Sequence, residues 1–126
     1  MKKLMTNAQI WEAYGKLEKA FSDENIILPI KINYNILINK QELFNKYMVI
    51  EQMRQAIGKK YGEYDASIEG FNVPAEKREI AQQELTQLLE IDQSVEIILC
   101  RLEDLENLNL TMAQMDAILF MIEKEE

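Results

Sequence analysis

The sequence predicts an α+β protein that is predominantly helical, with four helices and a small β element, folded as a single domain over residues 1–126. Three observations support this prediction. Apolar residues recur at helical spacing through most of the chain. Two Thr-x-x-Gln motifs have the form that begins helices. β-Branched residues gather in one short run near residues 95–102.

The first predicted helix covers about residues 7–21. Thr6 and Gln9 have the spacing of a capping box, in which each side chain bonds the backbone amide of the other residue. Apolar side chains then follow at helical intervals: Ile10, Trp11, Tyr14, Leu17 and Phe21. Gly15 lies inside this helix at a cost of about 1 kcal/mol relative to Ala, which would suit a close packing contact at that position.

The second predicted helix is long and covers about residues 29–61. Four apolar residues are spaced seven apart along it: Ile36, Leu43, Ile50 and Ile57. Pro29 suits the first turn of a helix, where its missing amide is not needed, and Gly62 is typical of a residue that ends one. Residues 29–40 also alternate nearly as a strand does, so a strand over this start remains an alternative.

Two shorter helices and the β element complete the prediction. Residues 63–73 are expected to form a loop with a β-turn at Glu69 and Gly70, followed by a third helix from Pro74 to about residue 91. Residues 95–102 favour a strand. The last helix begins at the second capping box and carries a soft apolar side of several residues: Met112, Met115, Phe120 and Met121. Such residues adapt to partner proteins but more often fill cores.

The composition excludes several kinds of catalytic and metal site. The chain has no His, which removes the commonest general base and transition-metal ligand. Its one Cys, Cys100, lies in an apolar run, so we expect a buried structural thiol and a reducing, cytoplasmic location. The four glycines form no phosphate-binding loop. We therefore predict no enzyme activity, no catalytic residue, no cofactor and no metal site.

The net charge of −8 is unevenly distributed along the chain. Residues 1–62 carry ten Lys or Arg and six Asp or Glu, a net +4, whereas residues 63–126 carry four and sixteen, a net −12. Such a chain is repelled by phosphate backbones and attracted to basic surfaces. We predict a partner-binding site of five acidic residues in the second half: Asp92, Glu96, Glu103, Asp104 and Glu106. A merely solvated acidic surface is the simpler alternative.

Other patterns narrow the range of partners. Arg54, Lys59 and Lys60 form a basic patch, but useful nucleic-acid affinity usually needs about six or more phosphate contacts, so we expect no direct nucleic-acid binding. No apolar run is long enough to cross a membrane, and no membrane partner is expected. The stripe from Ile36 to Ile57 would suit either packing within the chain or pairing with a second copy, which leaves a homodimer as an alternative.

Short motifs recur in order over most of the chain, at residues 4–17, 28–39, 54–63, 84–89, 95–97, 102–105 and 120–123. They include the Thr-Asn-x-x-Ile start of the first helix, Leu-Pro-x-Lys at 28–31 and Lys-Lys-Tyr-Gly-Glu at 59–63. In these motifs the chain resembles a group of short hypothetical proteins from phages and prophages of Gram-positive bacteria. The resemblance implies a helical phage accessory protein that acts in the host cytoplasm, and it supplies no catalytic residue.

Two functions follow as hypotheses. The first is a non-catalytic inhibitor of host defence, for example an anti-CRISPR protein, whose acidic surface occludes a basic, nucleic-acid-binding site on a host protein. The second is an accessory or chaperone protein of phage morphogenesis that binds a phage virion protein through apolar helical faces. The first predicts binding that is lost at high salt, and the second predicts little sensitivity to salt.

Overall fold

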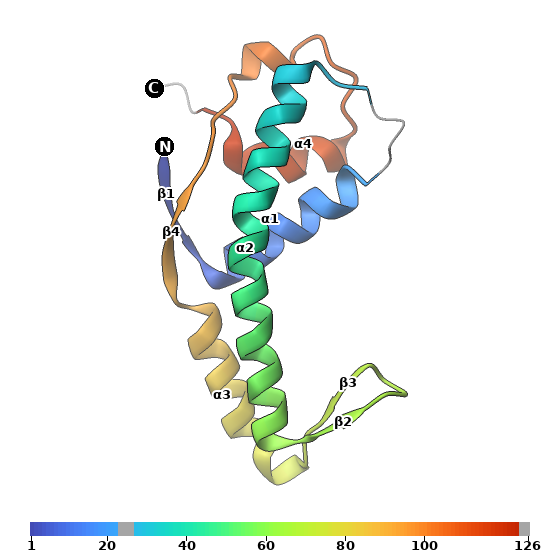
Figure 1. Ribbon diagram of the computed structural model, residues 1–126, viewed down its shortest axis with the longest axis vertical. Helices are drawn as coiled ribbons and strands as arrows, with labels where there is room; N and C mark the ends of the chain where they lie inside the picture. Colours follow the sequence, from blue (N-terminus) through green and yellow to red (C-terminus); the bar gives the residue numbers. More distant parts are fainter. Residues whose placement is uncertain (23–26, 124–126) are drawn as a thin grey trace.

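The computed structural model describes residues 1–22 and 27–123, which form a mostly helical α+β fold (Figure 1). These residues contain four α-helices and two small antiparallel sheets, as the predicted fold class requires. The elements in chain order are β1 (Lys2–Thr6), α1 (Asn7–Ala20), α2 (Ile30–Tyr61), β2 (Glu63–Asp65), β3 (Gly70–Asn72), α3 (Arg78–Leu89), β4 (Asp92–Glu96) and α4 (Met112–Ile118).

The long helix α2 organises the molecule. It runs along most of the structure, with α1 packed on it, α4 packed on α1, and α3 beside its second half (Figure 1). Its bounds confirm the predicted long helix, and the alternative of a strand over residues 29–40 is wrong. Capping boxes form at both predicted positions, at the starts of α1 and α4.

The core lies between α2, α1, α4 and the β1–β4 sheet. Ile36, Leu43 and Ile50 of the predicted stripe are at most 6% exposed, and Ile57 is partly buried. They join buried residues of the other segments, among them Ile10, Leu17, Val95, Ile97, Ile118 and Met121. Because this stripe is used inside the chain, it is not available for pairing with a second copy.

The predicted small β element is present, but its strand begins and ends earlier than residues 95–102. The strand is β4, Asp92–Glu96, and it pairs antiparallel with β1, a strand that the sequence analysis did not predict. In this register Lys2 lies opposite Glu96 and Thr6 opposite Asp92. Basic and acidic segments from the two ends of the sequence thereby lie side by side.

The backbone of Ile97 still bonds that of Met1, and from Ile98 onward the segment bonds to groups outside the β1–β4 sheet. The Asn39 side chain is fully buried; its Nδ2 donates to the Ile98 carbonyl oxygen at 2.9 Å, and its Oδ1 accepts from the Ile98 amide at 2.8 Å. The amide of Cys100 then donates to the Met121 carbonyl oxygen at 2.7 Å. A buried side chain of α2 thus takes the place of a neighbouring strand.

The third and fourth helices are shorter than expected. A 3-10 turn, Ala75–Lys77, follows Pro74, and α3 ends at Leu89 rather than near residue 91. Asn7 fixes this end. Its side-chain Nδ2 donates to the Leu88 carbonyl oxygen at 2.8 Å, and its backbone amide donates to the Ile91 carbonyl oxygen at 2.9 Å. After α4 the chain continues as a further 3-10 turn, Leu119–Met121.

The predicted loop at residues 63–73 is a hairpin of β2 and β3 that projects from the end of α2 (Figure 1). Its turn is stabilised by the Asp65 carboxylate, which accepts hydrogen bonds from the amide and hydroxyl of Ser67. These bonds lower the pKa of Asp65. At Gly62 a Cβ atom would overlap the Asn72 carbonyl oxygen, so the hairpin closes on α2 only with glycine there. The close neighbour considered at Gly15 is absent, since nothing lies within 4 Å of a Cβ built there.

We predict that Asn39→Ala lowers the free energy of unfolding by about 2–4 kcal/mol, because both backbone groups of Ile98 lose their partner in a largely buried region. Asn45→Ala, at an exposed position of the same helix, is the matched control and should change it by less than about 0.5 kcal/mol. Urea unfolding followed by circular dichroism measures both. Equal effects of the two substitutions would contradict the role given to Asn39.

We predict opposite effects for two glycine substitutions. Gly62→Ala should lower the free energy of unfolding by about 1–3 kcal/mol, because the new Cβ pushes on the backbone of Asn72 and cannot be relieved by a rotamer change. Gly15→Ala should raise it by up to about 1 kcal/mol, because Ala is the better helix former and space is available. Thermal unfolding of both variants tests this, and a stabilising Gly62→Ala would show that the hairpin does not close as described.

Candidate protein-binding surfaces

The five predicted acidic residues are all exposed, but they lie in two places. Asp92 and Glu96 stand at the two ends of β4, roughly 13 Å apart along an extended strand. Glu103 and Asp104 lie on the 3-10 turn Leu102–Leu105, and Glu106 follows it. This turn lies near the first residues of α2 (Figure 1).

Cations from the first half of the chain lie against carboxylates of the second half. The amino group of Met1 is 3.1 Å from Glu96 Oε1, and Lys16 Nζ is 3.1 Å from Asp116 Oδ2. Within the second half, Arg101 Nη1 lies 3.3 Å from Glu103 Oε1. These ion pairs partly neutralise the acidic second half of the chain. Two of the five predicted residues, Glu96 and Glu103, are among the paired carboxylates.

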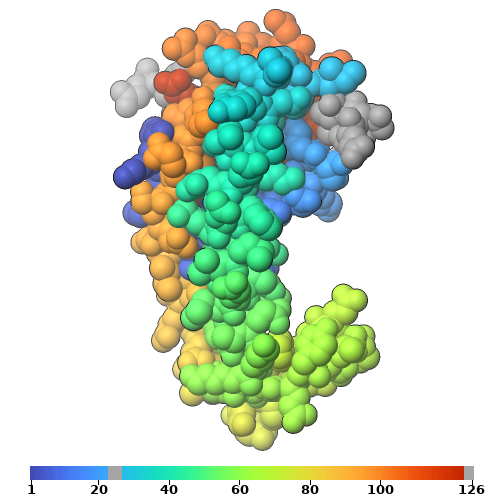
Figure 2. Space-filling view, in the orientation of Figure 1, coloured from blue at the N-terminus to red at the C-terminus, as the bar shows by residue number. Residues whose placement is uncertain are grey.

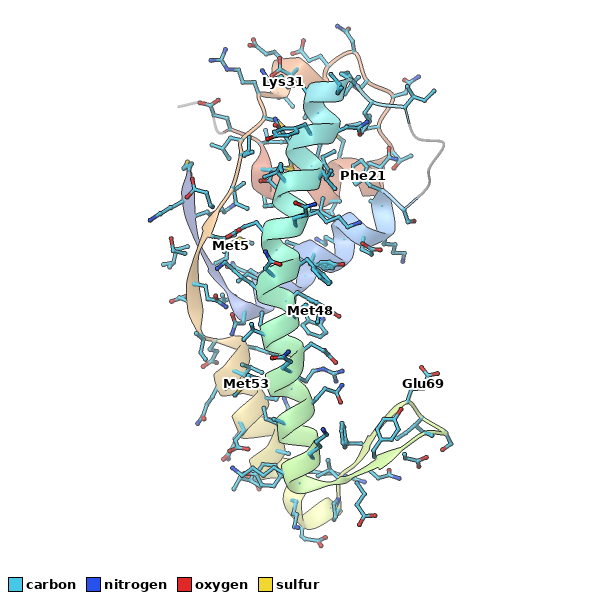
Figure 3. All side chains as sticks on the ribbon, viewed as in Figure 1. Met5, Phe21, Lys31, Met48, Met53 and Glu69 are labelled. Atoms are coloured by element: carbon cyan, nitrogen blue, oxygen red, sulfur yellow. The ribbon has the colours of Figure 1, made fainter. Side chains whose placement is uncertain are left out.

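The exposed side of α2, the longest helix, carries a second candidate surface, and this surface is apolar. On the side of α2 opposite the core, a series of residues follows alternating intervals of four and three. Five of them are apolar, with 41–88% of each residue exposed: Ile30, Tyr34, Leu37, Phe44 and Met48. Gln41, also exposed, occupies the one polar step of this series. We call these six residues the outer stripe. Figure 2 shows the cyan-to-green atoms of α2 uncovered along the front of the molecule, and Figure 3 labels Met48 among the side chains of this helix.

The outer stripe continues into aromatic side chains at the contact of α1 with α2. The rings of Trp11 and Tyr47 are 4.4 Å apart between centroids, those of Tyr14 and Tyr47 4.6 Å, and those of Tyr14 and Phe44 5.5 Å. The Arg54 guanidinium lies 5.6 Å from the centre of the Trp11 ring. Aromatic residues, Met and Arg are enriched at protein interfaces.

The first part of the outer stripe is also free of carboxylates. Residues 27–41 contain Lys31 and Lys40 and no Asp or Glu, in a chain that has 22 acidic residues. Lys40 is itself paired, with its Nζ 2.6 Å from Glu18 Oε2 on α1. This surface therefore differs in character from the rest of an acidic protein, as an interface core depleted of charge would.

One member of the predicted basic patch near the end of α2, Lys60, lies beside cations from another segment. Lys60 lies beside Lys77 and Arg78 around an open cleft of about 580 Å³. Lys60 Nζ is 2.8 Å from Glu84 Oε1, and this ion pair lowers the pKa of Glu84. Three cations, one of them paired, are still fewer than the phosphate contacts that useful nucleic-acid affinity usually needs.

Two other candidates belong to the core. Cys100 is 3% exposed and receives a 3.5 Å contact from Asn35 Nδ2, so it is a buried thiol, as expected. The methionines of the last helix do not share one face, because Met121 is fully buried and Met115 partly buried, whereas Met112 is 91% exposed.

Within residues 1–22 and 27–123, which the structure describes, no three Cys, Asp or Glu side chains gather closely enough to hold a metal ion. No helix there combines the length and the apolar character needed to span a membrane.

The ion pairs beside the outer stripe predict a dependence of stability on pH. Lys40 lowers the pKa of Glu18, and Arg54 lowers that of Glu51 through two hydrogen bonds of 2.9 and 3.1 Å. Their stabilisation is thus present above the ordinary glutamate pKa, about 4.3, and is lost as the pH falls through the lowered folded-state values. Each exposed pair contributes no more than roughly 0.5 kcal/mol after solvent screening.

We therefore expect the double variant Glu18→Gln, Glu51→Gln to lose less free energy of unfolding than the wild type between pH 7 and pH 3. The difference should be about 0.5–1 kcal/mol, measured by urea unfolding at each pH. Glu106→Gln, at an exposed position of the acidic turn, serves as the control. Identical pH profiles for the double variant and the wild type would refute this contribution.

Comparison with known proteins gives no relative from which a role could be transferred. No family model, no curated protein and no solved structure matches the chain. Its surfaces are therefore interpreted from their own chemistry.

Proposed function

We propose that the chain is a non-catalytic protein-binding protein that contacts its partner through the outer stripe of α2. The observation that carries this proposal is the row of five large apolar side chains on an exposed helix face, interrupted once by Gln41. Covering apolar surface contributes roughly 25 cal/mol per Å² before the costs of association are subtracted, and grouped apolar exposure of this kind marks interaction sites.

The outer stripe favours one of the two functional hypotheses over the other. Binding through an apolar helical face suits an accessory or chaperone protein of phage morphogenesis, whose partner would be a virion protein. Electrostatic occlusion of a host protein is the second candidate, and the three exposed carboxylates at Glu103, Asp104 and Glu106 support it. Exposed charges of this kind mainly affect association rate and its salt dependence.

The proposal is tested by capture of partners from bacterial lysate, with and without phage infection, at low and high salt. We expect Leu37→Glu with Met48→Glu to reduce recovery of the partner at least about tenfold, because two charges would be buried in the contact. Gln83→Glu with Gln87→Glu, at exposed positions of α3, is the control of equal charge and should leave recovery unchanged.

A third variant separates the two candidates. Reversing the three acidic residues, as Glu103→Lys, Asp104→Lys and Glu106→Lys, should leave recovery unchanged if the outer stripe makes the contact. Loss of the partner in this variant and at high salt, with the outer-stripe variant unaffected, would contradict the proposal and support electrostatic occlusion.

A further inference from the structure

We propose that in the free protein the outer stripe is occupied by a second copy of this chain, with the two α2 helices packed antiparallel. This inference rests on the proposed function, because it takes the outer stripe to be a binding surface and names what covers it. The homodimer considered from the sequence would have used the opposite stripe, which is buried in the core.

The spacing of the outer stripe matches that of a helix that pairs with another helix. Alternating steps of four and three residues give a mean repeat of 3.5, the repeat that keeps one seam of a helix against a partner helix. The repeat holds from Ile30 to Met48, so the seam covers 19 residues, about 28 Å of helix. Beyond it the same side of α2 turns polar: Glu51, Gln52, Gln55 and Lys59.

An antiparallel arrangement centred near residue 39 brings the apolar part of one seam onto that of the other. Ile30 then faces Met48 of the second copy, and Tyr34 faces Phe44 of the second copy. Leu37 faces Gln41 of the second copy, so the polar residue of each chain does not face its own equivalent. A parallel arrangement would instead place Glu51 against Glu51 and Lys59 against Lys59, with like charges adjacent along the polar half.

Charge explains why a second copy is a suitable occupant despite the net charge of −8. Two acidic chains repel each other over most of their surfaces. The seam and its flanks over residues 27–41 contribute no carboxylate to that repulsion. The outer stripe is thus a place where two copies can approach with few acidic groups between them.

The size of the seam predicts a weak dimer. The outer stripe offers six residues over about 28 Å of helix, whereas each partner contributes roughly 20–30 residues to a standard stable interface. We therefore expect dimer and monomer to coexist, and a heterologous partner that binds the outer stripe would displace the second copy.

Sedimentation velocity of the full chain from about 5 to about 500 µM, a range that brackets micromolar affinity, tests the inference. We expect a rise from monomer to dimer with concentration. Leu37→Glu should abolish this rise, whereas Gln41→Leu should strengthen the dimer about tenfold, because Gln41 is the polar step of an otherwise apolar seam. Gln83→Glu is the charge-matched control and should behave as the wild type. Circular dichroism verifies that each variant is folded.

Cysteine cross-linking tests the orientation. A mixture of Leu37→Cys and Gln41→Cys chains should form a mixed disulfide, because these positions face each other across an antiparallel seam. If disulfides form mainly between two Gln41→Cys chains, the antiparallel orientation is overturned. Cys100 is buried and serves as the internal background in every sample.

The outcomes separate this inference from the proposed function. A wild-type chain that stays monomeric throughout the series overturns the second copy as occupant, and the proposed function still stands if the outer-stripe variant loses its partner. A dimer that persists in Leu37→Glu overturns the present inference as well, because the contact would then lie elsewhere.

Discussion

The two hydrogen bonds between Asn39 and Ile98 join the long helix to the segment that follows β4, at a residue with no exposed surface. A buried amide side chain without partners would be costly, and so would the unpaired backbone of Ile98. Satisfying both at once fixes which side of α2 faces the core. The opposite side then necessarily faces outward, and that is the side that carries the outer stripe.

The residues of α2 make this helix apolar on two sides. Helices with one apolar side bury it and expose a polar side, whereas α2 buries Ile36, Leu43 and Ile50 and exposes Tyr34, Leu37 and Met48. Apart from Phe44, whose ring lies 5.5 Å from that of Tyr14, the apolar residues of this second side are not among those packed on the core in the described part of the chain. The presence of this side along 19 residues is the physical reason for assigning a binding role to the helix.

Local signals in the sequence were sufficient for the presence of the four helices and for the starts of α1 and α4. The capping residues Thr6 and Thr111 act over three positions, and the stripe from Ile36 to Ile57 marks the core side directly. The pairing of β1 with β4 and the bonds of Asn39 to Ile98 join residues far apart in sequence, and no local pattern contains them. The outer stripe also had a signal in the sequence, the four-and-three spacing from Ile30 to Met48. The stronger seven-residue repeat lies on the same helix and obscured this signal. The acidic residues were visible in the sequence, whereas their partial neutralisation by Met1 and Arg101 depends on the fold.

Binding on the outer stripe can be tested directly at two exposed methionines. Met48 lies in the stripe and Met112 lies on α4, and their side chains are 42% and 91% exposed. Methyl NMR of methionine-labelled protein, recorded over a concentration series and with any captured partner, reports both sites in one spectrum. We expect the Met48 signal to shift while that of Met112 stays in place. A shift at Met112 with Met48 unchanged would contradict binding on the outer stripe.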